Sequence, residues 1–131
     1  MKKWISRVIQ KFMYAIIGIW ITIKEERSLL SHLIISVIVI GLGVSVRLSL
    51  NRWAILILTI SIVIGFEVIN TSVEALVDMI SFRYNLKVKK VKDIAAGATL
   101  VVSIAAFAIG LIIFIPELIE LKEGIKKGIW Q

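Results

Sequence analysis

The stretch WAILILTISIVIGF, residues 53–66, has no charged side chain and runs directly into EVINTSVEALVD, residues 67–78. The first half has the composition of a transmembrane helix. The acids and the asparagine of the second half recur every three or four positions: Glu67, Asn70, Glu74 and Asp78. On a helix this spacing places them along one stripe. A helix that begins as a membrane span and ends in a polar stripe indicates both the fold and where a function resides.

The composition extends the membrane interpretation to the whole chain. The 131 residues are 59% hydrophobic, and the mean hydropathy of +0.96 is well above ordinary globular usage. A water-soluble fold of this length has too little interior to bury so much apolar surface. No cysteine is present, which excludes disulfides, thiolate metal sites and cysteine nucleophiles. The formal charge of +7 favours anionic lipid headgroups or an anionic substrate over nucleic acid.

The amino-terminal segment, residues 1–27, is predicted to be an amphipathic helix. Apolar side chains recur at helical spacing from Trp4 to Ile23. The basic residues lie largely off that apolar stripe: Lys2, Lys3, Arg7 and Lys11. A basic face opposite a face with Trp fits a helix lying in the membrane interface. The alternative is an ordinary packed helix of a soluble bundle.

Three longer apolar segments follow, at residues 29–46, 53–82 and 94–115, and Pro116 ends the third. Each is close to the roughly 20 residues that cross about 30 Å of hydrocarbon. Backbone polar groups in lipid must be paired within the segment, so these spans are helices. We therefore expect a single-domain, all-α integral membrane protein over residues 1–131. The tail, residues 117–131, is left open as a surface helix, a subunit contact or a disordered segment.

The basic residues predict the orientation of the spans. Six of them precede the first span, and five lie in the loop of residues 83–93, between the second and third spans. With three spans these two groups share a side of the membrane. The other side has only Arg47 and Arg52 and the mixed-charge tail. The positive-inside rule places the amino terminus and the 83–93 loop in the cytoplasm.

The acids on the second span differ in depth. At about 1.5 Å per residue, Glu67 lies roughly 21 Å along the helix from Trp53, still about 9 Å short of the cytoplasmic edge of the hydrocarbon. Glu74 lies roughly 10 Å further on. An acid at mid-bilayer costs roughly 2.5–3.5 kcal/mol on insertion scales, so these residues should face protein or a polar cleft. The alternative, a solvated helix end, fits Asp78 but not Glu67.

The polar residues at the cytoplasmic interface fit a particular chemistry. Glu26 ends the amphipathic helix at this level, and Lys92 and Asp93 directly precede the third span. Carboxylates are hard oxygen ligands for Mg²⁺, and ammonium groups neutralise phosphate charge. The chain has no GxxxxGK[ST] loop and no glycine-rich kinase loop. The residues alone therefore predict a small site for a cation and an anion, without naming a nucleotide.

EVINTSVEALVD resembles the signature of the small prokaryotic diacylglycerol kinase/undecaprenol kinase family, E-x-[LIVM]-N-[ST]-[SA]-[LIV]-E-x-x-V-D, at every specified position. The similarity extends to YAIIGIWITIKEE, residues 14–26, and to KVKDIAAGA, residues 90–98. It implies an integral membrane kinase that transfers the γ-phosphoryl group of MgATP to a lipid hydroxyl. It also implies a homotrimer with sites shared between subunits, in a bacterial plasma membrane, with the amino terminus and active site cytoplasmic.

The resemblance assigns roles by position. Glu67 matches the general base at the acceptor hydroxyl. Glu26 and Glu74 match the carboxylates that hold Mg²⁺ with the ATP phosphates, and Asn70 matches a polar residue that orients the site. The positions that match nucleotide- and phosphate-binding residues are Lys92, Asp93, Asn70, Tyr14 and Arg7.

Other positions in the matched segments carry less chemistry. Asp78 belongs to the signature, and we assign it structural support. His32 matches a histidine that is common in the Gram-positive branch, and as a lone histidine it is expected to be structural. Ser28 and Leu30 stand where relatives often have Asn and a basic residue.

Several functions stay open. KEER…H and KDIAAGA resemble the branch that phosphorylates undecaprenol to undecaprenyl phosphate, and the alternative is a diacylglycerol kinase that makes phosphatidic acid. Intramembrane acids also build ion pathways, so a small ion or proton transport subunit is a candidate from another class, and a non-catalytic scaffold is a third. Ala106 and Gly110 form a small-xxx-small pair, which favours close helix packing within one subunit or between subunits.

Overall fold

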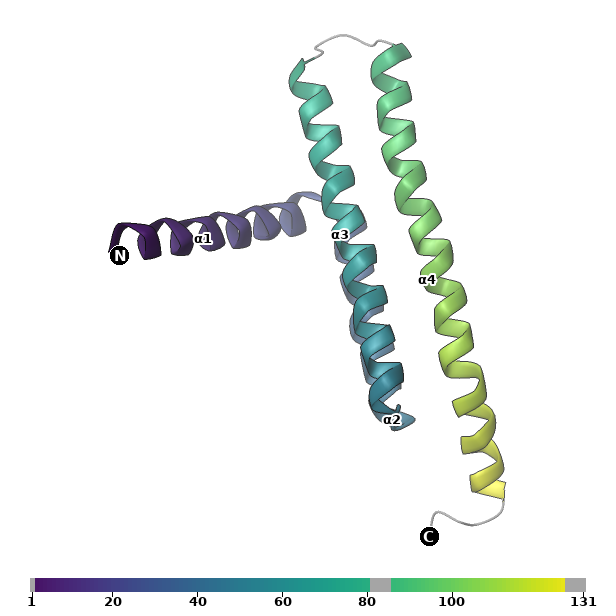
Figure 1. Cartoon of the computed structure of the whole chain (residues 1–131). Coiled ribbons are helices and arrows are strands. Elements are labelled where there is room, and N and C mark those ends of the chain that lie inside the picture. Colours follow the sequence, from purple (N-terminus) through teal and green to yellow (C-terminus); the bar gives the residue numbers. More distant parts are fainter. Residues whose placement is uncertain (1, 81–85, 127–131) are drawn as a thin grey trace.

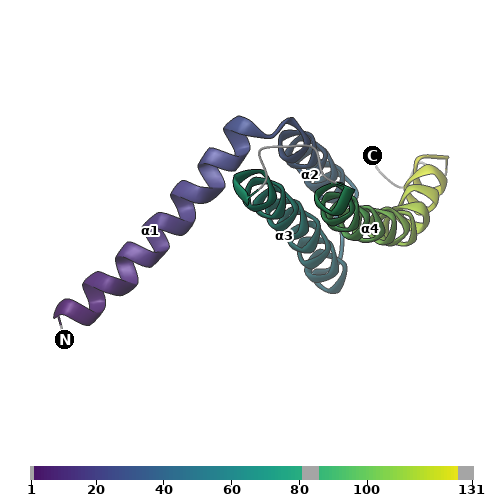
Figure 2. The ribbon, with the colours of Figure 1, turned by 90° about the horizontal axis from the view of Figure 1, so that it is seen from above.

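The computed structural model describes residues 2–80 and 86–126, and all regular structure in these ranges is helical. The four helices are α1 (Lys2–Glu25), α2 (Arg27–Ser45), α3 (Leu50–Ile80) and α4 (Leu86–Lys126). α2, α3 and α4 lie side by side and form a bundle, with α3 packed most extensively on α4 (Figure 1). α1 leaves this bundle at a steep angle (Figures 1 and 2).

All four helices are long and apolar enough to cross a membrane. This confirms the all-helical membrane class that the composition predicts. Length and composition do not separate α1 from the other three, but its direction does, because α1 does not run alongside them (Figure 2). Its large apolar side chains are exposed, with Trp4 at 71% and Phe12 at 67%.

The helix bounds differ from the sequence expectation at two places on α4. Residues 86–93, expected in a loop, form the first two turns of α4. Lys is a good helix former, so a basic segment ends a membrane span without ending the helix. Residues 81–85, which include part of the expected second span and loop, lie outside the described residues.

α4 also continues through Pro116 to Lys126, so residues 117–126 of the expected tail are helical. Residues 127–131 lie outside the described part of the chain. Proline removes one backbone hydrogen bond and usually kinks a helix rather than abolishing it when the following turns find other partners. In Figure 2 the carboxyl-terminal turns of α4 are angled away from the rest of the helix. Glu117, directly after the proline, forms an ion pair with Arg52 of α3.

The turn between α2 and α3 has a defined backbone geometry. Arg47 adopts a left-handed conformation with φ 55°. The Arg47 N–H donates to the Val44 carbonyl (3.2 Å), and the Leu48 N–H donates to the Gly43 carbonyl (3.1 Å). These two bonds form a Schellman motif, which satisfies helix-end carbonyls and usually has glycine at the left-handed position. The motif ends α2 and turns the chain back along α3.

A small apolar core packs against this turn. Leu48, Leu56 and Ile113 are buried together, and we call them, with the Arg52–Glu117 pair, the corner cluster. Gly43 allows this packing, because a Cβ atom there would lie 3.0 Å from both Leu48 Cδ1 and Trp53 Cη2. The corner cluster joins α2, α3 and α4 at the end of the bundle where the sequence predicts the non-cytoplasmic side.

Candidate functional site

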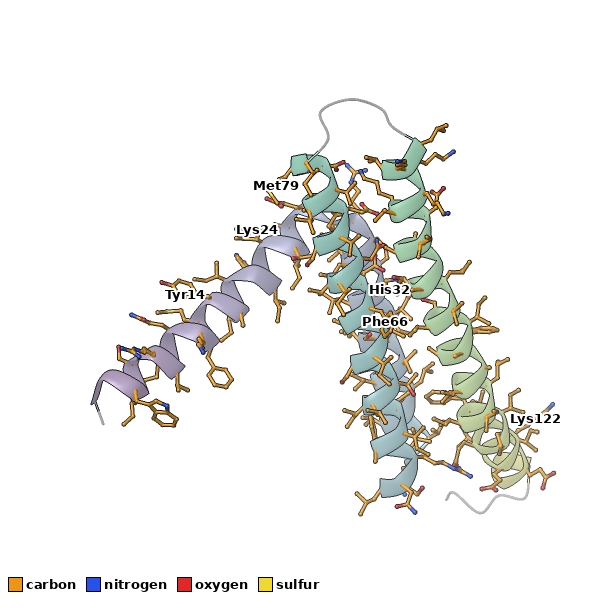
Figure 3. The ribbon with its side chains drawn as sticks, turned by 45° about the horizontal axis from the view of Figure 1, so that its top comes forward. Tyr14, Lys24, His32, Phe66, Met79 and Lys122 are labelled. Atoms are coloured by element: carbon orange, nitrogen blue, oxygen red, sulfur yellow. The ribbon has the colours of Figure 1, made fainter. Side chains whose placement is uncertain are left out.

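The polar stripe of α3 begins with a buried acid. Glu67 is only 4% exposed, and its Oε2 lies 3.7 Å from Nε2 of His32 on α2. His32 is labelled inside the bundle in Figure 3, near Phe66, the residue that precedes Glu67. The expectation that Glu67 faces protein rather than lipid is therefore confirmed. The contact with His32 was not predicted from the sequence.

One turn further along α3, Asn70 and Glu74 contact each other. The Asn70 Nδ2 donates a hydrogen bond to Glu74 Oε1 at 3.1 Å, the i, i+4 contact that one helix face permits. This bond fixes the orientation of the amide, and the other amide atom, Asn70 Oδ1, is buried without a hydrogen-bond partner among the described residues. Buried polar atoms are nearly always paired. An unpaired acceptor here points to a bound donor or cation.

The end of α3 carries an ion pair with α4. Lys92 Nζ lies 2.6 Å from Asp78 Oδ1, and the two side chains are 33% and 62% exposed. Because α3 and α4 are antiparallel, the first turns of α4 lie beside the last turns of α3 (Figure 1). Pairs this exposed are weak and screened by salt. A phosphate group can therefore replace Asp78 as the partner of Lys92 at little cost.

Glu26 occupies the junction between α1 and α2. Its backbone is extended, with φ −108° and ψ 108°, and its side chain makes no capping hydrogen bond to α2. Since α2 and α3 are antiparallel with His32 opposite Glu67, Glu26 lies about 9 Å further toward the polar end of α3, at the level of Glu74. The geometry thus leaves the Glu26 carboxylate available for a ligand at the same depth as Glu74.

The donor set fits Mg²⁺ bound together with phosphates. Among the described residues, no group of three or more His, Cys, Asp or Glu side chains could hold a metal ion alone. Magnesium in phosphate sites uses one or two carboxylates and completes its coordination with phosphate oxygens and waters. Glu26, Glu74 and the unpaired Asn70 Oδ1 are oxygen donors of the required kind. A closed metal site made only of protein ligands does not fit this part of the chain.

The other predicted site residues are more scattered. Asp93 is exposed on α4, and Arg7 and Tyr14 are exposed on α1. Tyr14 lies on the part of α1 that stands away from the bundle (Figure 3). A single chain therefore brings Glu67, His32, Asn70 and Glu74 together but leaves Arg7 and Tyr14 apart from them.

An apolar groove of about 420 Å³ begins at His32 and continues down the bundle. Its walls come from all three helices and include Val39, Leu56, Val63, Ala106 and Gly110. Gly110 has open space where a Cβ atom would lie, so the small pair on α4 lines a hollow. The groove thus starts at the histidine that contacts the buried acid.

Comparisons with known proteins agree with this arrangement. Residues 13–114 match the family described as prokaryotic diacylglycerol kinase. The chain is 36% identical to an undecaprenol kinase of Bacillus subtilis over 114 residues, which is 87% of this chain and 93% of that protein. It is 33% identical to a diacylglycerol kinase of Synechocystis sp. over 111 residues, 84% of this chain but only 63% of that protein. With the signature on α3 and the family match over most of the sequence, the chain belongs to the prokaryotic diacylglycerol kinase family and is a membrane lipid kinase.

Proposed function

We propose that this kinase phosphorylates undecaprenol to undecaprenyl phosphate, with MgATP as donor, at the cytoplasmic face of a bacterial plasma membrane. The observation that carries the proposal is the buried Glu67, placed between an apolar groove and the polar end of α3. A relative named undecaprenol kinase, matched over 93% of its length, supports the polyprenol. Diacylglycerol is the alternative acceptor, and the Synechocystis relative supports it.

In the proposed reaction Glu67 is the general base. Its carboxylate accepts the proton of the lipid hydroxyl while that oxygen forms a bond to the γ-phosphorus. The bond from the γ-phosphorus to the bridging oxygen breaks, and ADP leaves. Phosphoryl transfer needs chiefly alignment and charge neutralisation, so few residues are sufficient.

The polar end of α3 is proposed to bind the nucleotide. Glu26 and Glu74 would hold Mg²⁺, with Asn70 Oδ1 as a further oxygen donor, and the ion would neutralise charge on the phosphates. Lys92 exchanges Asp78 for a phosphate oxygen, and Asp93 lies beside it at the same level. Glu67 is roughly 10 Å deeper than Glu74, which suits a lipid arriving from the bilayer and a nucleotide arriving from the cytoplasm.

We further propose that the active unit is a homotrimer with shared sites, and that α1 lies in the membrane interface. Tyr14, which matches a nucleotide-binding position, lies on the part of α1 that stands away from its own bundle (Figure 3), and Arg7, which matches another, is about two turns nearer the amino-terminal end of the same helix. This position supports a contact of both residues with a neighbouring subunit in the proposed trimer. Crosslinking in native membranes would test this, because a monomer alone would contradict the shared site.

The test is a phosphoryl-transfer assay in detergent micelles with labelled MgATP and either undecaprenol or diacylglycerol. Wild-type protein should label the lipid, and Glu67→Gln should lose about 10²–10⁴-fold, the usual contribution of a general base. Glu120→Gln, an exposed acid on α4, is the matched control and should keep wild-type activity. If diacylglycerol is labelled faster than undecaprenol, diacylglycerol becomes the proposed acceptor instead of the polyprenol. Folded wild type that labels neither lipid would overturn the kinase reaction, and ion flux in liposomes would then test the transport subunit.

A further inference from the structure

His32 is the ionisable side chain in contact with Glu67 among the residues that the structure describes. The distance of 3.7 Å between Nε2 and Oε2 is longer than a hydrogen bond. A small rotation of either side chain would close it. Asn70, one turn away on α3, directs its amide donor at Glu74 instead. Among the described ionisable side chains, the imidazole is therefore the one close enough to orient the Glu67 carboxylate.

The same imidazole also borders the apolar groove. His32 is the groove residue at the polar end, and its side chain is 24% exposed, whereas that of Glu67 is 5% exposed. An apolar chain lying in the groove would bring its polar head to His32 first and to Glu67 directly behind it. The stretch of α4 that faces this depth, residues 94–115, contains no ionisable residue. Thus, at this depth, α4 offers no charged partner that would compete with His32 for the carboxylate.

We propose that His32 is a positioning residue for Glu67, a role that rests on the proposed function. The imidazole donates its Nε2–H to Glu67 Oε2, which leaves Oε1 free for the lipid alcohol. When the alcohol oxygen bonds to the γ-phosphorus and ADP leaves, the hydroxyl proton passes to Oε1. His32 itself neither gains nor loses a proton.

Three substitutions separate this role from simple packing. His32→Gln places an amide donor near the position of Nε2, His32→Asn places one nearer the backbone, and His32→Leu removes the donor. A misplaced base costs up to about 100-fold in rate. We therefore expect His32→Leu and His32→Asn to lower kcat about 10- to 100-fold, with the KM for MgATP unchanged, and His32→Gln to stay within about threefold of wild type.

Two controls sharpen the test. Ser31→Ala changes the neighbouring, exposed residue, whose hydroxyl donates a hydrogen bond to the Arg27 carbonyl of its own helix, and should have no effect. In a Glu67→Asp background the carboxylate is withdrawn from His32, so His32→Gln and His32→Asn should become equal. Coupling of this kind is expected only for residues that act on each other.

The outcomes decide between the roles. Equal activity of the Gln and Asn variants in the otherwise wild-type protein would overturn the proposal, whether both are active or both impaired. The comparison of His32→Gln with His32→Asn is valid even if His32→Leu fails to fold, because the Gln and Asn side chains differ by only one methylene group. Loss of activity in Glu67→Gln together with full activity in His32→Asn would overturn the role of His32 and leave the kinase intact. Inactive wild-type protein would overturn the proposed function itself.

Discussion

At the α2–α3 turn, Arg52 and Glu117 pair with each other, whereas toward the other end of the same bundle Asn70 keeps a buried oxygen that has no partner among the described residues. The corner cluster combines an ion pair with buried Leu48, Leu56 and Ile113. The polar end of α3 instead carries the Asn70–Glu74 hydrogen bond and the Asp78–Lys92 ion pair. In the corner cluster, the charged partners both come from the chain and stabilise it. Where binding is proposed, acceptors are left for a ligand.

This contrast predicts that equivalent substitutions act differently at the two ends. Glu74→Gln should lower the rate about 10²–10³-fold, because it removes one preorganised charged group from the phosphate site. A magnesium titration of the transfer assay should show a raised requirement for the ion. Glu117→Gln is the matched change in the corner cluster and should keep the rate per folded molecule. Comparable losses of rate in both variants would break the distinction between the ends.

Asn70→Leu should separate activity from stability. We expect the rate to fall about 10- to 100-fold as an orienting group is lost, while the midpoint of thermal unfolding stays level or rises. Removing an unpaired buried acceptor offsets the loss of the hydrogen bond to Glu74. Thermal unfolding in detergent, with and without MgATP, measures this. A large fall in the midpoint without nucleotide would show that Asn70 is structural.

The Asp78–Lys92 pair tests whether a weak contact can be exchanged for a ligand. Lys92→Met should raise the KM for MgATP about tenfold, the scale of one lost charge contact. Asp78→Asn should leave the KM within about threefold, because it frees Lys92 rather than removing it. Initial rates over a range of MgATP concentrations provide both values. A larger effect for Asp78→Asn would make the carboxylate part of the site.

Arg52→Met should destabilise the corner cluster by about 1–2 kcal/mol, less than the 3–5 kcal/mol of a fully buried pair, because Arg52 is partly exposed. Unfolding in mixed micelles with an increasing fraction of denaturing detergent measures this change in the free energy of unfolding. The double substitution Arg52→Met with Glu117→Met should recover much of the loss, since no charge is then left unpaired. A double variant no better than the single one would mean that the pair supplies more than charge compensation.

Much of the polar stripe could be predicted from the sequence, because the spacing of Glu67, Asn70 and Glu74 fixes their common face on any helix. The contact between His32 and Glu67 could not, because it depends on how two helices are rotated against each other. Folding α2 back on α3 about the turn at residues 46–49 does bring residue 32 within about a turn of residue 67. The similar distances of residues 32 and 67 from this turn are the one signal in the sequence that indicates the contact.

The predicted bounds of α4 were wrong because local sequence signals, a proline and a basic segment, do not end the helix in the folded chain. Pro116 is a strong helix breaker by itself, but the residue after it pairs with Arg52 on α3. The basic residues of 86–93 mark where the apolar span begins, not where the helix begins. The Asp78–Lys92 contact follows from this continuation, since it requires Lys92 to be on a helix beside α3.

The length of α2 makes the geometry of the site depend on the thickness of the bilayer. Its 19 residues span about 28 Å, close to the roughly 30 Å of hydrocarbon in an average membrane. Both ends are fixed, by the extended backbone at Glu26 and the left-handed residue Arg47, so α2 cannot lengthen in a thicker bilayer. Hydrophobic mismatch is then relieved by more tilt in a thinner bilayer, and by less tilt or local thinning of the lipid in a thicker one. Because His32 is on α2 and Glu67 is on the 31-residue α3, a change in the tilt of α2 relative to α3 would change the distance between them. The rate of phosphoryl transfer should consequently pass through an optimum as the acyl chains of the surrounding lipids are lengthened.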